Sequence, residues 1–164
     1  KGFAMTGWRI GFIGAPLLIA KACDKLQGQV TSATCSIAQR ATITAMELDP
    51  ANSKDIIDMR NKFRERRDMM FKLLKDIPNI KVILPQGAFY FFPEVNAYYG
   101  KSYKEYHIKD SNDLAMYLLY EANVALVPGA AFGDDNCIRL SYATSNDLLI
   151  EAVRRIKEAL LKLK

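Results

Sequence analysis

A sequence of 164 residues is long enough for one domain, or for a compact domain joined to part of another. Half of its residues are hydrophobic and a quarter are charged, which excludes a disordered, collagen-like or disulfide-scaffold protein. The net charge of +5 raises nucleic acid as a partner, but basic and acidic residues are interspersed along the chain. We interpret the charge as a solvated surface and expect no nucleic-acid binding.

The cysteine and histidine content argues against a metal site and against a secreted protein. Cys23, Cys35 and Cys137 are an odd number of thiols without metal-ligand spacing. We interpret them as reduced, buried side chains of a cytoplasmic protein. The single histidine, His107, lies in a polar stretch where a surface position is favoured over a catalytic one. No apolar run approaches the roughly 20 residues of a membrane span, so we expect no membrane partner.

The first part of the chain follows a strand, helix, helix pattern. The aromatic, β-branched and glycine residues from 8 to 16 predict a buried strand that ends at Pro16. A helix is predicted directly after Pro16, and another over residues 37 to 48 with Ser36 as its cap. A long helix is predicted from about 53 to 76, and we interpret its basic residues as a solvated face and the helix as a bridge between domains.

The pattern changes after this long helix to short strands separated by turns. Four strands are predicted, at residues 80 to 85, 87 to 95, 124 to 129 and 137 to 143. A helix is predicted over residues 111 to 122, with its cap at one of the residues 111 to 113 and Asn123 as a left-handed stop. An amphipathic helix begins near Asn146 and carries one apolar face, which includes Leu148 and Leu149. These elements predict an α+β domain with helices on one face of a small sheet.

Two cations and a glycine lie close together in the opening stretch KGFAMTGWRIGF. Gly7 precedes Trp8 and Arg9, and a glycine allows the backbone to approach a ligand closely. If both cations face one cavity, Arg9 could hold a phosphate while Lys1, desolvated beside that charge, loses its proton more easily. A neutral lysine amine attacks an aldehyde to form a Schiff base. The alternatives are a surface lysine and an arginine in a structural ion pair.

A third cation lies on a predicted strand near the end of the chain. Arg139 alternates there with the apolar residues Ile138 and Leu140. A buried arginine needs an anionic partner, because desolvating an unpaired charge is costly. The partner could be the carboxylate of a ligand or the acid of a structural salt bridge.

The opening stretch resembles the cofactor-lysine signature of the class I and II aminotransferases, fold type I enzymes that use pyridoxal 5′-phosphate. The stretches SIAQRA, GAFYFFPEV, VPGAAFG and IRLSYATS resemble, in this order, parts of the aspartate aminotransferase branch. The resemblance covers essentially the whole chain. It implies an α/β fold in which residues 1–65 form the end of a large cofactor-binding domain and the start of a bridging helix, and residues 66–164 form a small α+β domain.

The resemblance also implies roles for the three cations. Lys1 would bond covalently to pyridoxal 5′-phosphate and move a proton during the reaction, Arg9 would pair with the cofactor phosphate, and Arg139 would bind the α-carboxylate of the substrate. The implied reaction is transamination between an amino acid, with aspartate as first choice, and a 2-oxo acid such as 2-oxoglutarate. A homodimer is implied as well.

The sequence departs from the family pattern in ways that leave alternatives open. Ala33 and Thr34 stand where related sequences often have asparagine and proline. The chain begins at Lys1 without an initiator methionine, so we interpret it as the C-terminal portion of a longer enzyme and expect it to be inactive alone. The same scaffold serves β-lyases, cyclopropane-carboxylate synthases and aromatic aminotransferases. It also serves non-catalytic effector-sensing domains of transcription regulators.

Overall fold

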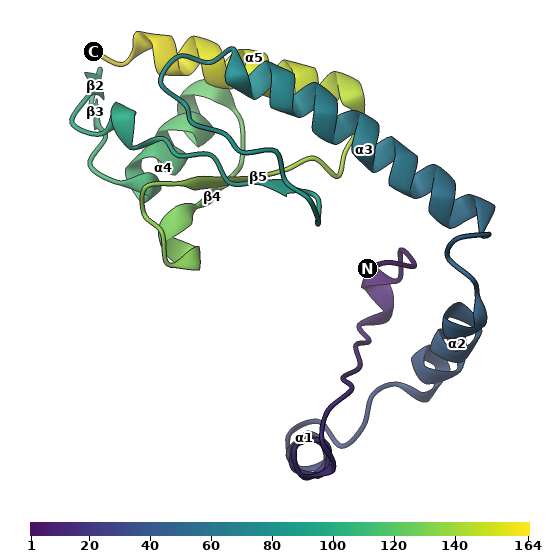
Figure 1. Cartoon of the computed structure of the whole chain (residues 1–164). Helices are drawn as coiled ribbons and strands as arrows, with labels where there is room; N and C mark the ends of the chain where they lie inside the picture. The colour runs from purple at the N-terminus through teal and green to yellow at the C-terminus, as the bar shows by residue number, and fades with distance from the viewer. The chain divides into compact units, whose positions relative to one another are not determined.

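The computed structural model describes all 164 residues, which form two compact units (Figure 1). Unit 1 comprises residues 1–60 and unit 2 residues 61–164, so the division falls between Arg60 and Asn61. This point lies inside helix α3, Lys54–Lys75, which confirms the long helix predicted from the sequence. The assignment of the two regions to a large and a small domain of a longer protein stays a prediction.

Unit 1 consists of short helical segments joined by irregular chain. They are the 3-10 turn η1, Thr6–Trp8, and the helices α1, Leu17–Val30, and α2, Ser36–Glu47, followed by the first part of α3. Pro16 occupies the N-cap of α1, close to its predicted position in the first turn. Cys35, rather than Ser36, is the N-cap residue of α2, and neither cap makes a side-chain hydrogen bond.

The strand predicted over residues 8 to 16 is wrong. Arg9 has a left-handed backbone with φ 51°, and the chain from there to Pro16 pairs with no other strand. Phe12 is 73% exposed and Ile13 62% exposed. A strand needs a neighbouring strand to satisfy its backbone N–H and C=O groups, and the other regular elements of unit 1 are helices. The apolar pattern therefore indicated a strand for which this unit has no partner.

The cysteines were only partly predicted. Cys137 is buried, as expected, whereas Cys23 and Cys35 are exposed. Cys23 lies on α1, whose residues are nearly all exposed, because unit 1 has almost no core against which the helix could pack. The prediction of buried thiols is therefore wrong for both cysteines of unit 1.

Unit 2 contains a three-stranded antiparallel sheet with the strand order β1-β5-β4 (Figure 1). Its strands are β1, Tyr90–Phe91, β4, Val127–Pro128, and β5, Ile138–Ser141. In the register, Tyr90 is opposite Ser141 and Val127 is opposite Arg139. The strand predicted for residues 80 to 85 is wrong, since pairing there is limited to one bridge between Lys81 and Glu94. The central position of β5 gives Arg139 a neighbouring element on each side.

A small hairpin and two helices complete unit 2. The hairpin pairs β2, Ser102–Tyr103, with β3, Tyr106–His107, and the helices are α4, Ser111–Ala122, and α5, Asn146–Lys162. His107 is exposed and its Nδ1 lies 2.8 Å from the Ser102 hydroxyl, which confirms a surface position. Asn123 ends α4 in a left-handed conformation, as predicted. The cap of α4 is Asp110, one residue before the predicted positions, and its carboxylate accepts a hydrogen bond from the Asp113 N–H.

The core of unit 2 lies between its helices and the sheet. Met70 and Leu74 of α3 belong to the same buried core as Leu149 and Ile156 of α5. The predicted apolar face of α5 is buried except for Ala152, which is half-buried, and Leu148, which is 61% exposed. Tyr117 of α4 is fully buried, and its hydroxyl donates a hydrogen bond of 2.7 Å to the Ala159 carbonyl of α5. No helix of the chain has both the length and the apolar character needed to cross a bilayer.

The connection from β4 to β5 is a tight loop that depends on Gly129. It contains the 3-10 turn η3, Gly129–Phe132. A Cβ atom on Gly129 would lie 2.1 Å from the Asp134 carbonyl oxygen and 2.2 Å from the Cys137 carbonyl oxygen. Only glycine fits where two carbonyl groups come this close. The loop is therefore closed tightly at its base, with Phe132 near its tip.

Candidate functional site

Lys1 and Arg9 both lie at the surface of unit 1. The Lys1 carbonyl accepts a hydrogen bond of 3.0 Å from the Ala4 N–H at the start of the chain. The Arg9 guanidinium donates through Nη1 to the Thr6 carbonyl oxygen at 3.2 Å, so the side chain folds back over η1. No carboxylate within unit 1 forms an ion pair with Arg9. The structural ion pair weighed for Arg9 is therefore absent, and its cationic group remains available to an anion.

A cavity of about 880 Å³ opens beside Arg9. Its wall includes Gly7, Trp8 and Arg9 from the opening stretch, together with Thr31 and Thr34 from the loop between α1 and α2. A Cβ atom on Gly7 would meet nothing within 4 Å, so the backbone there borders open space. No acidic residue lines the cavity. A guanidinium beside two hydroxyls without a competing acid is a suitable environment for a phosphate group.

The structure does not place Lys1 in the wall of this cavity. A second cavity of unit 1, of about 380 Å³, includes Phe3 and Trp8 and has mostly apolar walls, and Lys1 does not line it either. The arrangement in which both cations face one cavity is therefore not present among the residues of unit 1. Arg9 is the predicted residue that the structure associates with a cavity.

Arg139 lies in unit 2, at the middle of the sheet. Its neighbours on β5 are buried, with Ile138 1% and Leu140 7% exposed, whereas Arg139 itself is half-buried. The guanidinium carbon Cζ lies 4.5 Å from the ring centre of Tyr90 and 4.2 Å from that of Phe132. Both distances are well within the range of a cation–π interaction. The alternation predicted from the sequence is confirmed, and the two aromatic contacts are new.

The acids in the loop before β5 have other partners. Asp134 accepts hydrogen bonds from the backbone N–H of Asn136 and from the Cys137 thiol, which together hold the pKa of its carboxyl below the usual value. Burial, together with this contact, raises the pKa of the Cys137 thiol to about 11. Asp135 accepts from the Ser111 N–H and hydroxyl, at 3.1 and 2.6 Å. No ion pair within unit 2 involves Arg139, so this half-buried cation has N–H groups available for an external anion.

Sequence reasoning missed Tyr90 and Phe132 as partners of Arg139. The stretches GAFYFFPEV and VPGAAFG contained the signal, since the first places Tyr90 within a predicted strand and the second places Phe132 shortly after one. Which of these rings would contact Arg139 depends on the strand order and register, which single strands do not reveal. The buried Ser111, which is 0% exposed, was predicted only as a possible helix cap.

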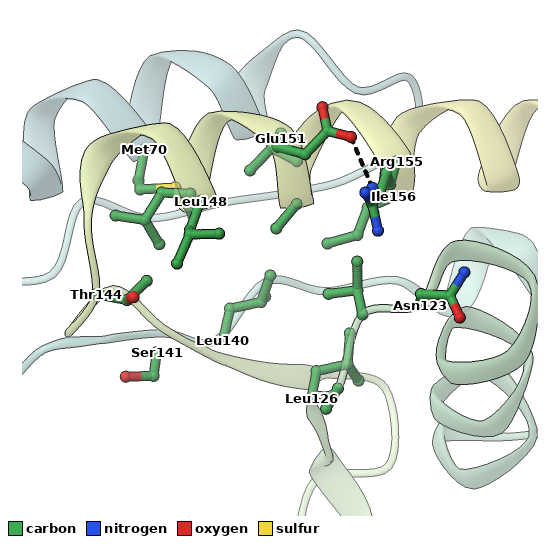
Figure 2. A pocket seen from close by; sticks show the side chains of 15 residues that line it. Met70, Asn123, Leu126, Leu140, Ser141, Thr144, Leu148, Glu151, Arg155 and Ile156 are labelled. Carbon is green, nitrogen blue, oxygen red and sulfur yellow. Dashed lines mark hydrogen bonds and ion pairs between the residues drawn. The ribbon is translucent and has the colours of Figure 1, made fainter.

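Unit 2 also has a cavity of about 310 Å³ between α5 and the chain that follows α4 (Figure 2). Leu148 and Ile156 of α5 point toward Leu126 and Leu140 across it. At its rim the Arg155 Nε donates to Glu151 at 2.7 Å. None of Lys1, Arg9 and Arg139 lines this cavity.

Comparison with protein families gives one match over nearly the whole chain. The family model described as aminotransferase class I and II matches residues 1–156. Among curated proteins, the chain is 47% identical over 165 aligned residues to a bifunctional aspartate aminotransferase and glutamate/aspartate-prephenate aminotransferase of Petunia hybrida. It is 44% identical to an aspartate aminotransferase of Pinus pinaster. In both cases the alignment covers all of this chain but 34% of the relative, so the chain spans about a third of their length.

Solved structures show the same relationship in three dimensions. The aspartate aminotransferase from Rhizobium meliloti aligns with a TM-score of 0.88 and 39% identity, over 100% of this chain and 40% of that one. An aromatic aminotransferase from Pyrococcus horikoshii OT3 aligns with a TM-score of 0.83 and 34% identity, over 98% of this chain and 41% of that one. The fold is therefore shared by proteins named for different substrates.

Proposed function

Because the chain belongs to the class I and II aminotransferase family, we propose that a polypeptide of its relatives' length containing this chain transfers an amino group from aspartate to 2-oxoglutarate. The observation that carries the proposal is Arg139, a half-buried cation on β5 without an acidic partner in unit 2. An amino acid and a 2-oxo acid both present a carboxylate beside the reacting carbon. One arginine can therefore bind the substrates of both half-reactions.

The residues of this chain fit pyridoxal 5′-phosphate in the chemistry of their donors. Its phosphate matches the Arg9 guanidinium and the hydroxyls of Thr31 and Thr34 on one cavity wall, where no acid competes. Its aldehyde is the kind of group with which the Lys1 amine reacts. When bound, the cofactor withdraws electrons from the α-carbon of the substrate. The remaining contacts of the ring would come from residues outside this chain.

Each cation then has a separate task. Arg9 holds an anion in place by charge and by paired N–H donors. Arg139 orients the substrate through two parallel hydrogen bonds to its carboxylate, which a lysine cannot reproduce with the same geometry. The Lys1 Nζ would accept the proton released from the α-carbon of the substrate as a general base, and would then give this proton back as a general acid.

The domain assignment and the assembly belong to the same proposal. Residues 1–65 would form the end of the large cofactor-binding domain and the start of the bridging helix, and residues 66–164 the small domain. The division between residues 60 and 61 lies close to this boundary and within α3, which is compatible with a bridging helix. The intact enzyme would be a homodimer.

The test is steady-state kinetics of the full-length protein with aspartate, tyrosine and alanine as amino donors and 2-oxoglutarate as acceptor. We expect aspartate to be the best donor. Arg139→Ala should lower kcat/KM by about 2–5 kcal/mol of transition-state binding, roughly 30-fold to several thousand-fold, since truncating one partner of a buried charge pair has this cost. Lys1→Ala should abolish turnover. Absence of aspartate turnover, or unchanged kinetics of Arg139→Ala, would overturn the proposal.

A second acceptor is favoured by the names of several relatives. The Petunia protein is named for prephenate as well as aspartate, and a protein of Aquifex aeolicus, 41% identical over 160 residues, is named a probable aspartate/prephenate aminotransferase. Prephenate presents a 2-oxo acid group that Arg139 could bind in the same way. Replacing 2-oxoglutarate by prephenate in the same assay decides whether this chain shares that specificity.

A further inference from the structure

We propose that Tyr90 and Phe132 are positioning residues that clamp the guanidinium of Arg139 between their rings and so orient it toward the substrate carboxylate. The inference rests on the proposed role of Arg139 as the carboxylate receptor. It adds two residues to that site, neither of which contacts the carboxylate in this arrangement.

The two rings reach Arg139 from opposite sides of its strand. Tyr90 is on β1 and Phe132 is at the end of η3, directly after β4, and β1 and β4 flank the central strand β5. The guanidinium carbon lies over both rings, at 4.5 Å from the centre of the first and 4.2 Å from that of the second. An arginine held by one neighbour could still rotate, whereas rings on both sides restrict the rotamers of its long side chain.

The chemistry of the guanidinium makes this arrangement useful. Its N–H groups lie in the plane of the group, while its two faces carry no donors. Aromatic rings that cover the faces stabilise the charge without using the N–H groups. The in-plane donors therefore stay available for a carboxylate, and the entropy lost on binding is smaller because the side chain is already ordered.

The Phe132 side of the clamp is fixed by buried contacts at the base of its loop. Ser111 is 0% exposed, and its hydroxyl donates to Asp135 at 2.6 Å and accepts from the Ala130 N–H at 3.2 Å. These bonds join the start of α4 to both ends of the loop. The ring of Phe92 meets that of Phe132 edge to face, with their centres 6.2 Å apart. Phe132 is thus held by its backbone and by a neighbouring ring.

The experiment measures the inhibition constant of succinate, a dicarboxylate that cannot be transaminated, together with KM and kcat for aspartate in the full-length enzyme. We expect Phe132→Leu and Tyr90→Leu each to raise the inhibition constant and KM by about fivefold to tenfold, the scale of a desolvated cation–π contact. We expect kcat to change by less than twofold, because ground state and transition state lose the same binding. Phe132→Tyr and Tyr90→Phe, which keep a ring, should remain within twofold of the wild type.

Two further variants separate a local role from a general one. Tyr120 is an aromatic residue on α4 that is 61% exposed, and it is not one of the rings that contact Arg139, so Tyr120→Leu should behave like the wild type. In an Arg139→Ala background, adding Phe132→Leu should have no further effect on the inhibition constant, since the group that the ring positions is gone.

The outcomes distinguish this inference from the function on which it rests. If Arg139→Ala weakens succinate binding while both leucine variants bind succinate as the wild type does, the clamp is overturned and the carboxylate receptor stands. If Arg139→Ala itself leaves succinate binding unchanged, both proposals are wrong. Equal losses in the leucine variants and in the ring-retaining variants would also overturn the clamp, because stacking would then not be the cause.

Discussion

The two units of the chain differ in how completely they bury their apolar residues. Unit 2 has a continuous core of residues from α3, α4, α5 and the sheet. In unit 1 the buried hydrophobic residues are Ala38 and Ala45, while Leu18 and Val30 are 83% and 70% exposed. Since the hydrophobic effect scales with the apolar area removed from water, it stabilises unit 2 far more than unit 1. Arg139 on β5 is therefore positioned by the core of its own unit. Lys1 and Arg9 of the opening stretch have little core beneath them.

The distribution of aromatic residues makes this difference measurable within one molecule. The single tryptophan, Trp8, lies in unit 1, and all eight tyrosines lie in unit 2. During urea unfolding of the 164-residue chain, tryptophan fluorescence reports on unit 1 and near-ultraviolet circular dichroism of tyrosine reports on unit 2. We expect the tryptophan transition at a lower urea concentration. Coincident transitions would show that the units unfold together.

The largest effect is expected from shortening a core residue of unit 2. Ile156 of α5 is 1% exposed, so Ile156→Ala should lower the free energy of unfolding by about 2–5 kcal/mol in the tyrosine signal. The matched control is Ile19→Ala on α1, where the isoleucine is 52% exposed and the cost should stay within about 0.5 kcal/mol. Similar losses in both variants would contradict the contrast between the units.

The next effect tests the loop that carries Phe132. Gly129→Ala should destabilise unit 2 by about 1–3 kcal/mol, because the new Cβ would have to displace two backbone carbonyl groups. Gly87→Ala is the control in the same unit, since a Cβ there meets nothing within 4 Å. The free energies of unfolding from urea titrations decide the matter. A Gly129→Ala protein as stable as the control would mean that the loop rearranges easily.

Local signals in the sequence predicted the long helices of unit 2 well. The capping and stop residues of α4 were predicted within one residue, and the apolar face of α5 was predicted except for Ala152, which is half-buried, and Leu148, which is exposed. Helices are specified by neighbours along the chain, so their apolar periodicity can be recognised in a single sequence. The alternation around Arg139 is equally local and was predicted correctly, although the arginine is half-buried rather than buried.

Features that depend on distant residues were predicted poorly. The apolar stretch 8–16 has the composition of a strand but no pairing partner within unit 1, and composition does not reveal whether a partner exists. The rings around Arg139 come from two other elements, so their contact follows from strand order rather than from any motif. The likeness to the aminotransferases supplied roles for Lys1, Arg9 and Arg139, and the structure adds the surroundings of each.

A smaller effect is expected at the buried hydroxyl between α4 and α5. Tyr117→Phe should lower the free energy of unfolding by about 1 kcal/mol, the net contribution of one hydrogen bond. The bond lost is the one to the Ala159 carbonyl. Burial also raises the pKa of the Tyr117 phenol to about 12. Its neutral form is therefore favoured in the folded state. The stability that depends on the neutral phenol is fully present below pH 10 and is lost as the pH rises toward 12. The variant should lose less stability than the wild type over that range, as measured by urea unfolding, and equal losses would contradict the role of burial.

The smallest effect is expected at the exposed ion pairs of α5. Glu151 accepts hydrogen bonds from Arg154 and Arg155, and these contacts lower the pKa of its carboxyl to about 2. A lowered folded-state pKa means that the pairs stabilise the protein above about pH 4.5 and lose their effect as the pH falls toward 2. Glu151→Gln should therefore be slightly less stable than the wild type at pH 7, by an amount that shrinks in 1 M salt, because exposed pairs are screened. Glu105→Gln, which removes an exposed acid without a salt bridge, serves as the control for the change in net charge. If Glu151→Gln and the wild type differed in free energy of unfolding by the same amount at pH 2 as at pH 7, the ion pairs would not be the source of that difference.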